Sequence, residues 1–172
     1  MMALDEDPSL AETQLYRRLE AIEVAYMSHA HDPVFTVAEA QALRGSLPGQ
    51  HCKCLLLVDK KERLYLAVVR EEITVDLKWL AGALGAGRFS FAKPHLLWNA
   101  LHVKPGAVTP FALINDRAHL VQPVLDAAML DAPLVNYHPL RNDRTTAIAP
   151  QGLLKFISEC GHVAKILRFP SA

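Results

Sequence analysis

The sequence of 172 residues lacks an excess of charge of either sign, because 18 lysines and arginines balance 18 aspartates and glutamates. Proteins that hold long stretches of nucleic acid usually carry a basic excess, so any nucleic-acid partner is expected to be held over a small part of its length. No apolar run approaches the roughly 18 residues that span a bilayer, and we expect no contact with a membrane. The acidic N-terminus, residues 1–7, has no apolar stretch behind it, which argues against a signal peptide.

Cysteine is also scarce, and familiar cofactor motifs are missing. The three cysteines, Cys52, Cys54 and Cys160, cannot all pair within one chain, so reduced thiols in a cytoplasmic protein are expected. A zinc site would need ligands from distant histidines, so we expect no metal. Gly85-Ala86-Gly87 begins like a dinucleotide-binding loop, but Ser90 stands where the third glycine belongs. No P-loop and no nucleophile elbow are present, and we expect no cofactor.

Apolar periodicity predicts one mixed domain of α/β type (α+β), with a largely antiparallel sheet surrounded by helices. We expect this domain to cover residues 1–172, with a flexible N-terminus at 1–9. Capping boxes at Ser9–Glu12 and Thr36–Glu39 mark two helix starts. Charged turns predict two hairpins, 52–58 with 64–69 and 111–115 with 120–125. The helices are expected at 10–23, 36–45, 76–84, 94–101 and 151–160, and further strands at 24–31, 88–91, 134–137, 145–148 and 163–169.

Lys53 is unusual because it lies inside the apolar strand 52–58, directly after His51. Alternation of side chains places Cys52 and Cys54 on one face of this strand and His51 and Lys53 on the other. If both faces are covered, the ammonium must reach a cleft, find an anionic partner or lower its pKa. Two interpretations remain: an edge-strand lysine that extends to water, or a cationic group at the floor of a pocket.

Two loops carry polar groups that suit ligand binding. Gly106-Ala107-Val108-Thr109-Pro110 joins a predicted helix to a predicted strand. Glycine permits close approach of a backbone and proline fixes the exit, so this loop can present N–H and C=O groups to a ligand. His138 and Asn142 supply an imidazole and an amide after another strand. An ordinary loop and a structural histidine are the alternatives.

Taken in order, these pieces resemble the YbaK/ProX family, which comprises the bacterial-type prolyl-tRNA synthetase editing domain and its free-standing relatives. The order and spacing of the matching segments are more specific than any one of them, and together they span about residues 31 to 168. The resemblance implies the fold of that editing domain. The matching segments are 31–40, 49–53, 76–80, 106–111 and 138–146.

The resemblance implies hydrolysis, in trans, of the ester that joins an amino acid to the terminal adenosine of tRNA. Alanyl-tRNA(Pro) is the expected substrate, and the expected partner is the acceptor end of tRNA(Pro), with transient association with a synthetase or the elongation machinery. Lys53 is implied to be the catalytic residue. The expected substrate-binding residues are His31, Phe35, Thr36, His51, Cys54, Gly106, Ala107, Val108, Thr109, Pro110, His138 and Asn142.

One departure from the family pattern leaves the amino acid open. Many alanine-specific relatives carry asparagine after the lysine, whereas this chain has Cys54, a thiol that hydrogen-bonds weakly. Cysteine, serine or threonine on tRNA are therefore alternative substrates for the same chemistry. Two other functions stay open as well: a non-catalytic module that binds tRNA or a partner, and a hydrolase that uses Cys52 or Cys54 as its nucleophile.

Overall fold

A mixed sheet of eight strands organises the chain in the computed structural model, which describes residues 8–33, 36, 38–39, 42 and 47–170. The strands are β1 (Tyr26–Ala30), β2 (Gln50–Val58), β3 (Leu64–Arg70), β4 (Ser90–Phe91), β5 (Val121–Asp126), β6 (Val135–Tyr137), β7 (Arg144–Ile148) and β8 (Lys165–Leu167). The α-helices are α1 (Pro8–Ala21), α3 (Leu77–Leu84), α4 (Pro94–Leu101) and α5 (Pro150–Glu159), and the 3-10 helices are η2 (Pro110–Asn115) and η3 (Ala127–Asp131).

Seven of the strands follow the order β1-β7-β6-β2-β3-β5-β8, and β4 pairs with the far end of β2. The antiparallel pairings are β1–β7, β2–β3, β2–β4 and β6–β7, and the parallel ones are β2–β6, β3–β5 and β5–β8. The predicted α+β class with a mostly antiparallel sheet is therefore confirmed. So is the first predicted hairpin, in which β2 and β3 pair from Cys52↔Arg70 to Val58↔Leu64.

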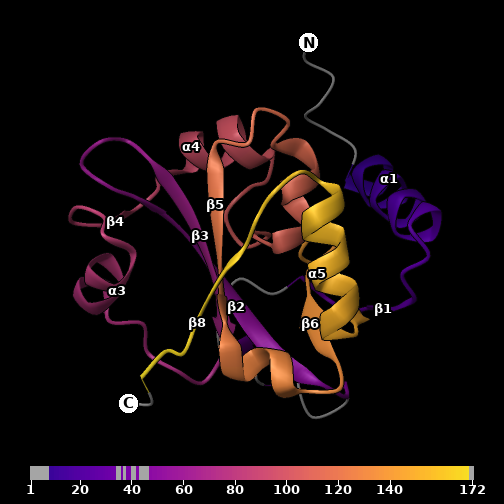
Figure 1. The fold of residues 1–172 in the computed structure, drawn as a ribbon. Helices are drawn as coiled ribbons and strands as arrows, with labels where there is room; N and C mark the ends of the chain where they lie inside the picture. The colour runs from indigo at the N-terminus through magenta and orange to yellow at the C-terminus, as the bar shows by residue number, and fades with distance from the viewer. Residues whose placement is uncertain (1–7, 34–35, 37, 40–41, 43–46, 171–172) are drawn as a thin grey trace.

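The side chains on the two faces of β3 pack in two separate apolar clusters. Leu66 and Val68 belong to the larger cluster, which also contains residues of α1, α4, η2 and α5. Tyr65, Ala67 and Val69 belong to the smaller cluster, which α3 covers. Figure 1 shows α3 on one side of these strands and α5 on the other. A strand that is buried on both faces explains the continuous apolar run in the sequence.

The caps of α3 are as the sequence predicts, whereas the capping box predicted at Ser9–Glu12 is wrong, because Ser9 already lies inside α1. The Asp76 side chain accepts the backbone N–H groups of Lys78 and Trp79 at the start of α3, and Gly85 closes the helix with a left-handed φ of 64°. Thr36 and Glu39 form the expected capping box, in which the Glu39 N–H donates to Thr36 Oγ1 at 3.1 Å. Most of the helix predicted at 36–45 lies outside the described residues.

The second predicted hairpin is wrong. Residues 110–115 form the 3-10 helix η2 instead of a strand, and β5 pairs in parallel with β3. Pro110 occupies the first turn of this helix, and Thr109 caps it by accepting the N–H of Phe111 at 3.2 Å. The run 111–115 is apolar but short, and such a run fits a buried strand or a buried helix equally well.

Asp126 joins the end of β5 to the end of β3. Its side chain is fully buried and accepts hydrogen bonds from the Arg70 Nε at 2.7 Å and the Arg70 backbone N–H at 3.1 Å. The carbonyl of Arg70 in turn accepts the N–H of Ile73 at 3.3 Å. This chain of contacts fixes the turn that leaves β3, and the carbonyl of Ile73 is the group that Lys53 contacts.

Replacing Asp126 by alanine is expected to destabilise the fold by about 3–5 kcal/mol, because it leaves the guanidinium of Arg70 without its buried carboxylate. Arg63→Ala is the matched control, since Arg63 is half-exposed in its ion pair with Asp59 and its loss should cost less than about 1 kcal/mol. Urea unfolding of both variants measures the difference. Equal free energies of unfolding for the two variants would contradict this role of Asp126.

Candidate active site

Lys53 lies on the face of β2 that packs toward α3. Leu55 and Leu57 share this face, and both belong to or pack against the smaller cluster. The Nζ of Lys53 donates a hydrogen bond to the carbonyl of Ile73. Burial lowers the pKa of Lys53 from its ordinary value, and the nearby carboxylate of Glu72 opposes this shift. The Lys53 ammonium is therefore held by a backbone carbonyl in a partly desolvated position.

Strands β2 and β6 separate directly before Lys53, the predicted catalytic residue, and His138, a predicted substrate-binding residue. Their parallel register contains only Gln50↔Val135 and His51↔Asn136. Lys53 and His138 each lie two residues beyond the second of these pairs, one on each strand. Beyond this point β2 pairs with β4, whereas β6 ends and the chain turns back into β7. The register thus brings the lysine and the histidine to the same level of the sheet, where it divides.

The hydrogen bonds of His138 define which nitrogen of its ring carries a proton. Nδ1 lies 2.8 Å from the carbonyl oxygen of Arg144, which can only accept, so Nδ1 is the protonated nitrogen. Burial lowers the pKa of His138 below 6.5, the neighbouring His31 lowers it further, and the Arg144 carbonyl opposes the shift. A neutral ring with Nδ1–H leaves Nε2 as a proton acceptor.

His31 lies beside His138, with 6.2 Å between the ring centroids. Its Nδ1 lies 2.7 Å from the carbonyl of Asp32, and its Nε2 lies 2.8 Å from Thr145 Oγ1. Because the carbonyl of Asp32 can only accept, Nδ1 donates to it, and in this tautomer Nε2 accepts a hydrogen bond from the Thr145 hydroxyl. The prediction of site residues did not include Thr145, which belongs to β7 and lies beside this part of the chain because β7 pairs with β1 and with β6.

His29 shares the same face of β1 with His31 and pairs directly with Thr145 across the two strands. Its Nε2 is buried and has no hydrogen-bond partner among the residues that the structure describes. The sequence already shows that the two histidines share a face. It does not show that both lie against the strand that follows His138.

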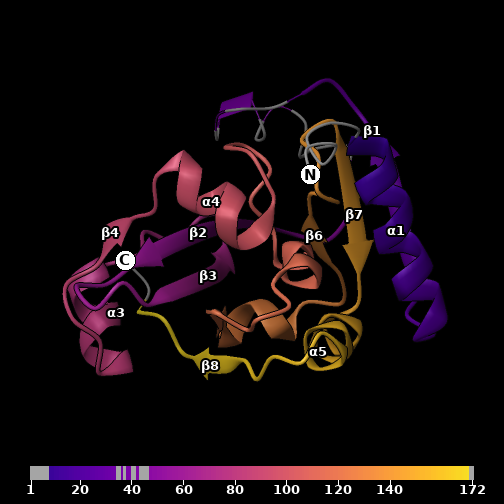
Figure 2. The same cartoon turned by 90° about the horizontal axis from the view of Figure 1, so that it is seen from above.

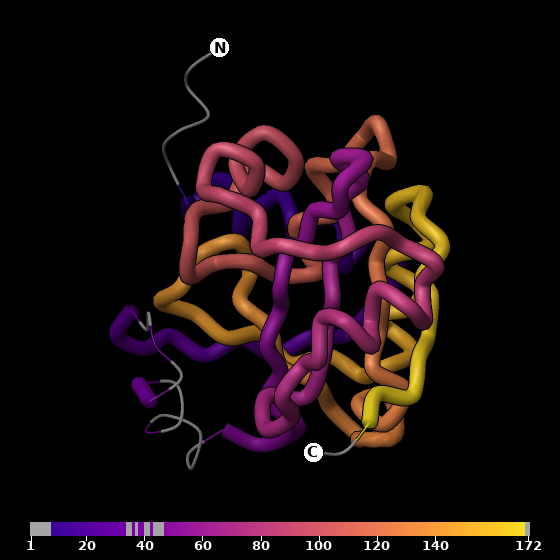
Figure 3. The backbone as a smooth tube through the Cα atoms, turned by 90° about the vertical axis from the view of Figure 1, so that its left-hand side faces the viewer, coloured from indigo at the N-terminus to yellow at the C-terminus, as the bar shows by residue number. Residues whose placement is uncertain are grey.

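The loop from Gly106 to Pro110 is anchored to the end of β6. Gly106 takes a left-handed φ of 91°, and the N–H of Ala107 closes a turn on the carbonyl of Lys104 at 3.0 Å. Thr109 is fully buried, and Phe111 packs edge-on against Tyr137 with 5.8 Å between the ring centroids. Tyr137 directly precedes His138. Figures 2 and 3 show this loop and the β6–β7 connection close together at one side of the molecule.

The other predicted residues are placed less closely with Lys53. His51 Nε2 lies 3.2 Å from the carbonyl of Leu47, and Thr36 is engaged in its capping box. Val108 packs against the larger cluster. Asn142 lies in the β6–β7 connection, and Phe35 lies outside the described residues. The structure therefore groups His31, His138 and the loop after Gly106 around the end of β6.

Cys54 is not brought together with these groups. It packs with Cys52 against the larger cluster, on the face of β2 opposite to Lys53. Burial raises the pKa of Cys52 to about 12, and burial together with the neighbouring Cys52 raises the pKa of Cys54 well above its ordinary value. All three cysteines are free thiols. Protonated thiols in the core are poor nucleophiles, which argues against a cysteine mechanism.

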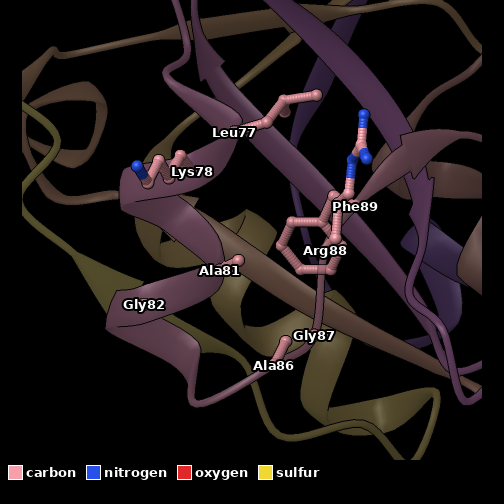
Figure 4. A pocket seen from close by; sticks show the side chains of 8 residues that line it. All are labelled: Leu77, Lys78, Ala81, Gly82, Ala86, Gly87, Arg88 and Phe89. Atoms are coloured by element: carbon pink, nitrogen blue, oxygen red, sulfur yellow. The ribbon is translucent and has the colours of Figure 1, made fainter.

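A cavity of about 640 Å³ lies between α3 and the segment that leads into β4. The described residues that line it include none of the predicted site residues. Figure 4 shows the side chains of Lys78 and Arg88 directed away from each other at its border. Ala81 and Phe89 of this cavity belong to the smaller cluster, so it lies on the same face of the sheet as Lys53. Its lining residues are Leu77, Lys78, Ala81, Gly82, Ala86, Gly87, Arg88 and Phe89.

Within residues 8–33 and 47–170 and the few described positions between them, no three histidine, cysteine, aspartate or glutamate side chains are grouped so as to hold a metal ion. No helix in the described part of the chain is long and apolar enough to cross a membrane.

A family model described as "Aminoacyl-tRNA editing domain" matches residues 31–156. The prolyl-tRNA editing protein ProX of Acetoanaerobium sticklandii is 30% identical over 158 residues, which cover 91% of this chain and 96% of that protein. The prolyl-tRNA synthetase associated domain-containing protein 1 of Danio rerio is 35% identical over 158 residues, which cover 91% of this chain and 86% of that protein.

Two solved structures share the fold. One, of the hypothetical protein APE2540, has a TM-score of 0.73 and 19% identity and covers 91% of this chain and 98% of that chain. The other, of a proposed trans-editing enzyme for prolyl tRNA synthetase, has a TM-score of 0.72 and 20% identity and covers 94% of this chain and 98% of that chain. At these identities the likeness concerns the fold alone.

The lowered pKa of His138 predicts a specific dependence of stability on pH. The unfolded state, with a histidine pKa near 6.5, binds more protons than the folded state as the pH falls through 6.5 toward the lower folded pKa. The free energy of unfolding should therefore be highest above this window and decrease within it. Between about pH 7.5 and about pH 5.5, the wild type should lose more stability than His138→Asn, whose amide can still donate to the Arg144 carbonyl. Urea unfolding at both pH values measures this, and parallel losses would contradict it.

Proposed function

Because the chain belongs to the aminoacyl-tRNA editing domain family, we propose that it removes alanine from wrongly charged tRNA(Pro) in trans. The reaction is hydrolysis of the ester that joins the amino acid to the terminal adenosine. The observation that carries the proposal is the separation of β2 and β6, which sets Lys53 and His138 two residues beyond a shared pair. A cation and a neutral imidazole at one level of a divided sheet suit an ester carbonyl and an attacking water.

An aminoacyl ester is already activated, so the enzyme must position a water molecule and stabilise the oxyanion that develops. In our proposal Lys53 supplies positive charge to the ester carbonyl or the adjacent phosphate. Its present partner, the carbonyl of Ile73, is a neutral acceptor that an anionic oxygen can displace. The ribose hydroxyl next to the ester assists the attack of water.

His138 is proposed to accept the proton of the attacking water through Nε2 and to return it to the ribose oxygen that leaves when the ester bond breaks. This role agrees with the Nδ1–H···O contact to Arg144 and with a lowered pKa, because both favour a neutral ring with a free lone pair. The loop from Gly106 to Pro110 is proposed to fix the amino acid through its backbone groups. Its anchor on Tyr137, next to His138, supports this assignment.

A small binding space accounts for selection against proline. Because proline is larger than alanine, a space that fits alanine rejects correctly charged prolyl-tRNA. Exclusion of one methylene is worth only about 1–3 kcal/mol, so serine and cysteine are rejected less strongly than proline. The cavity beside α3 is proposed to lie next to the nucleic acid, since Lys78 and Arg88 at its border offer charges for phosphates.

A second function, docking to prolyl-tRNA synthetase without catalysis, is suggested by the name of the relative from Danio rerio. Docking alone would not require the lowered pKa values of Lys53 and His138. An assay of deacylation separates it from the enzyme.

The purified protein is expected to deacylate Ala-tRNA(Pro) faster than Pro-, Ser- or Cys-tRNA(Pro). Lys53→Ala should lower kcat/KM by about 100-fold or more, because it removes a charge that acts on the developing oxyanion. Lys60→Ala is the matched control, since Lys60 is an exposed lysine in the turn between β2 and β3. Preferential cleavage of another of these esters would keep the deacylase function and change only the amino acid assigned to the substrate. A folded protein that cleaves none of the four would overturn the proposal in favour of docking.

Alkylation should leave the activity intact, because burial raises the pKa of both Cys52 and Cys54 and both pack against the larger cluster. We expect iodoacetamide to cause no loss of deacylation, and Cys52→Ala to keep the wild-type rate. If alkylation stops the reaction and Cys52→Ala or Cys54→Ala is equally inactive while folded, a thiol nucleophile replaces the lysine mechanism. Loss on alkylation with active alanine variants would indicate only a blocked pocket.

A further inference from the structure

Glu12, on the N-terminal helix α1, makes contacts with the connection that carries His138. The Glu12 residue is 9% exposed. One carboxylate oxygen lies 3.2 Å from Arg141 Nη1, and the other lies 3.6 Å from Arg144 Nε. Helix α1 precedes residues 31–156, the part of the chain that the family model matches. A carboxylate outside the matched region therefore holds two arginines inside it.

Arg144 connects Glu12 to the imidazole of His138. Its side chain faces Glu12, while its carbonyl oxygen accepts the Nδ1–H of His138 at 2.8 Å. Arg141 is paired with Glu12 and also with Asp143, whose carbonyl accepts the N–H of His31 at 3.0 Å. Carbonyl groups of this one segment thus accept hydrogen bonds from both histidines, and Glu12 is the carboxylate of α1 that contacts the same segment.

Tyr16 extends the contact from Glu12 into the sheet. Its hydroxyl donates to Glu12 at 2.8 Å and lies 2.5 Å from Ser28 Oγ and 3.1 Å from Thr146 Oγ1. Burial raises the pKa of Tyr16, so the hydroxyl keeps its proton. Glu12 is therefore fixed between α1, β1 and β7.

We propose that Glu12 is a positioning residue of the editing site: it holds Arg141 and Arg144, and through the Arg144 carbonyl it fixes the orientation and the tautomer of the His138 ring. The proposal deepens the deacylase function and rests on it for its kinetic test.

Charge balance explains why this carboxylate is needed. Two arginines face two carboxylates, those of Glu12 and Asp143, and the side chains of Arg141 and Glu12 are only 16% and 12% exposed. Without the charge of Glu12, one guanidinium has no anionic partner in a partly buried place. That guanidinium is then more stable in water, and the backbone of the β6–β7 connection moves with it.

The test compares Glu12→Gln with Glu20→Gln. Glu20 is the matched control, because it is also on α1 and also accepts a tyrosine hydroxyl, from Tyr26 at 2.7 Å, but it is exposed. For Glu12→Gln we expect kcat on Ala-tRNA(Pro) to fall by about 10-fold or more with little change in KM, since a displaced catalytic group lowers the rate without changing substrate contacts. Glu20→Gln should behave as the wild type.

Long-range ¹H–¹⁵N correlation spectra of the imidazoles give a readout that does not depend on activity. His138 should be the Nδ1–H tautomer in the wild type and in Glu20→Gln, and a mixture of tautomers in Glu12→Gln. If Glu12→Gln does not fold, Glu12→Asp keeps the charge but shortens the reach to Arg144, and changes in the same direction but of smaller size are expected in kcat and in the His138 tautomer. Unchanged His138 signals in a folded Glu12 variant would overturn the proposal, whatever its rate. An inactive wild type would refute the deacylase function, while the tautomer comparison would still decide the role of Glu12.

Discussion

The short parallel pairing of β2 with β6 is the constraint on which the rest of the site depends. Two residue pairs, Gln50↔Val135 and His51↔Asn136, hold the strands together before they separate. Because the register is fixed there, Lys53 and His138 stand at the same level on two strands whose paired residues, His51 and Asn136, are 85 positions apart in the sequence. No local preference of the chain brings such distant residues together, so the site exists only in the folded sheet.

Desolvation gives the two residues their chemical character. Burial lowers the pKa of Lys53 and of His138, and each shift is limited by a polar neighbour, Glu72 for the lysine and the carbonyl of Arg144 for the histidine. The histidine is thereby kept neutral with a defined tautomer, while the ammonium keeps a neutral carbonyl as its partner. The surrounding contacts support this state from outside the site: Asp126 fixes the turn that carries Ile73, and Phe111 packs on the residue before His138.

The sequence predicts the local features of this protein well and its long-range pairings poorly. The caps of α3, the β2–β3 hairpin, the family and the enzyme class are confirmed, because each depends on neighbouring residues or on motifs in order. The run 111–115 was predicted as a strand and is a helix, since five apolar residues fit both. Thr145 and Arg144 were not predicted as parts of the site, because their contacts with His31 and His138 arise from the pairing of β7 with β1 and β6.

The position of Cys54 changes how the choice of amino acid has to be explained. Its thiol faces the larger cluster, so a cysteine in place of asparagine alters the packing beneath β2 and adds no group beside Lys53. In the proposed reaction, direct contacts with the amino acid are then expected from the other face of β2 and from the segments that gather at the end of β6. Those segments are tied to the core by Thr109, Phe111 and Tyr137, all of which are buried. Close-packed side chains deform little, so under this proposal the size of the space for the amino acid is set by the core that supports it as much as by the residues that touch it.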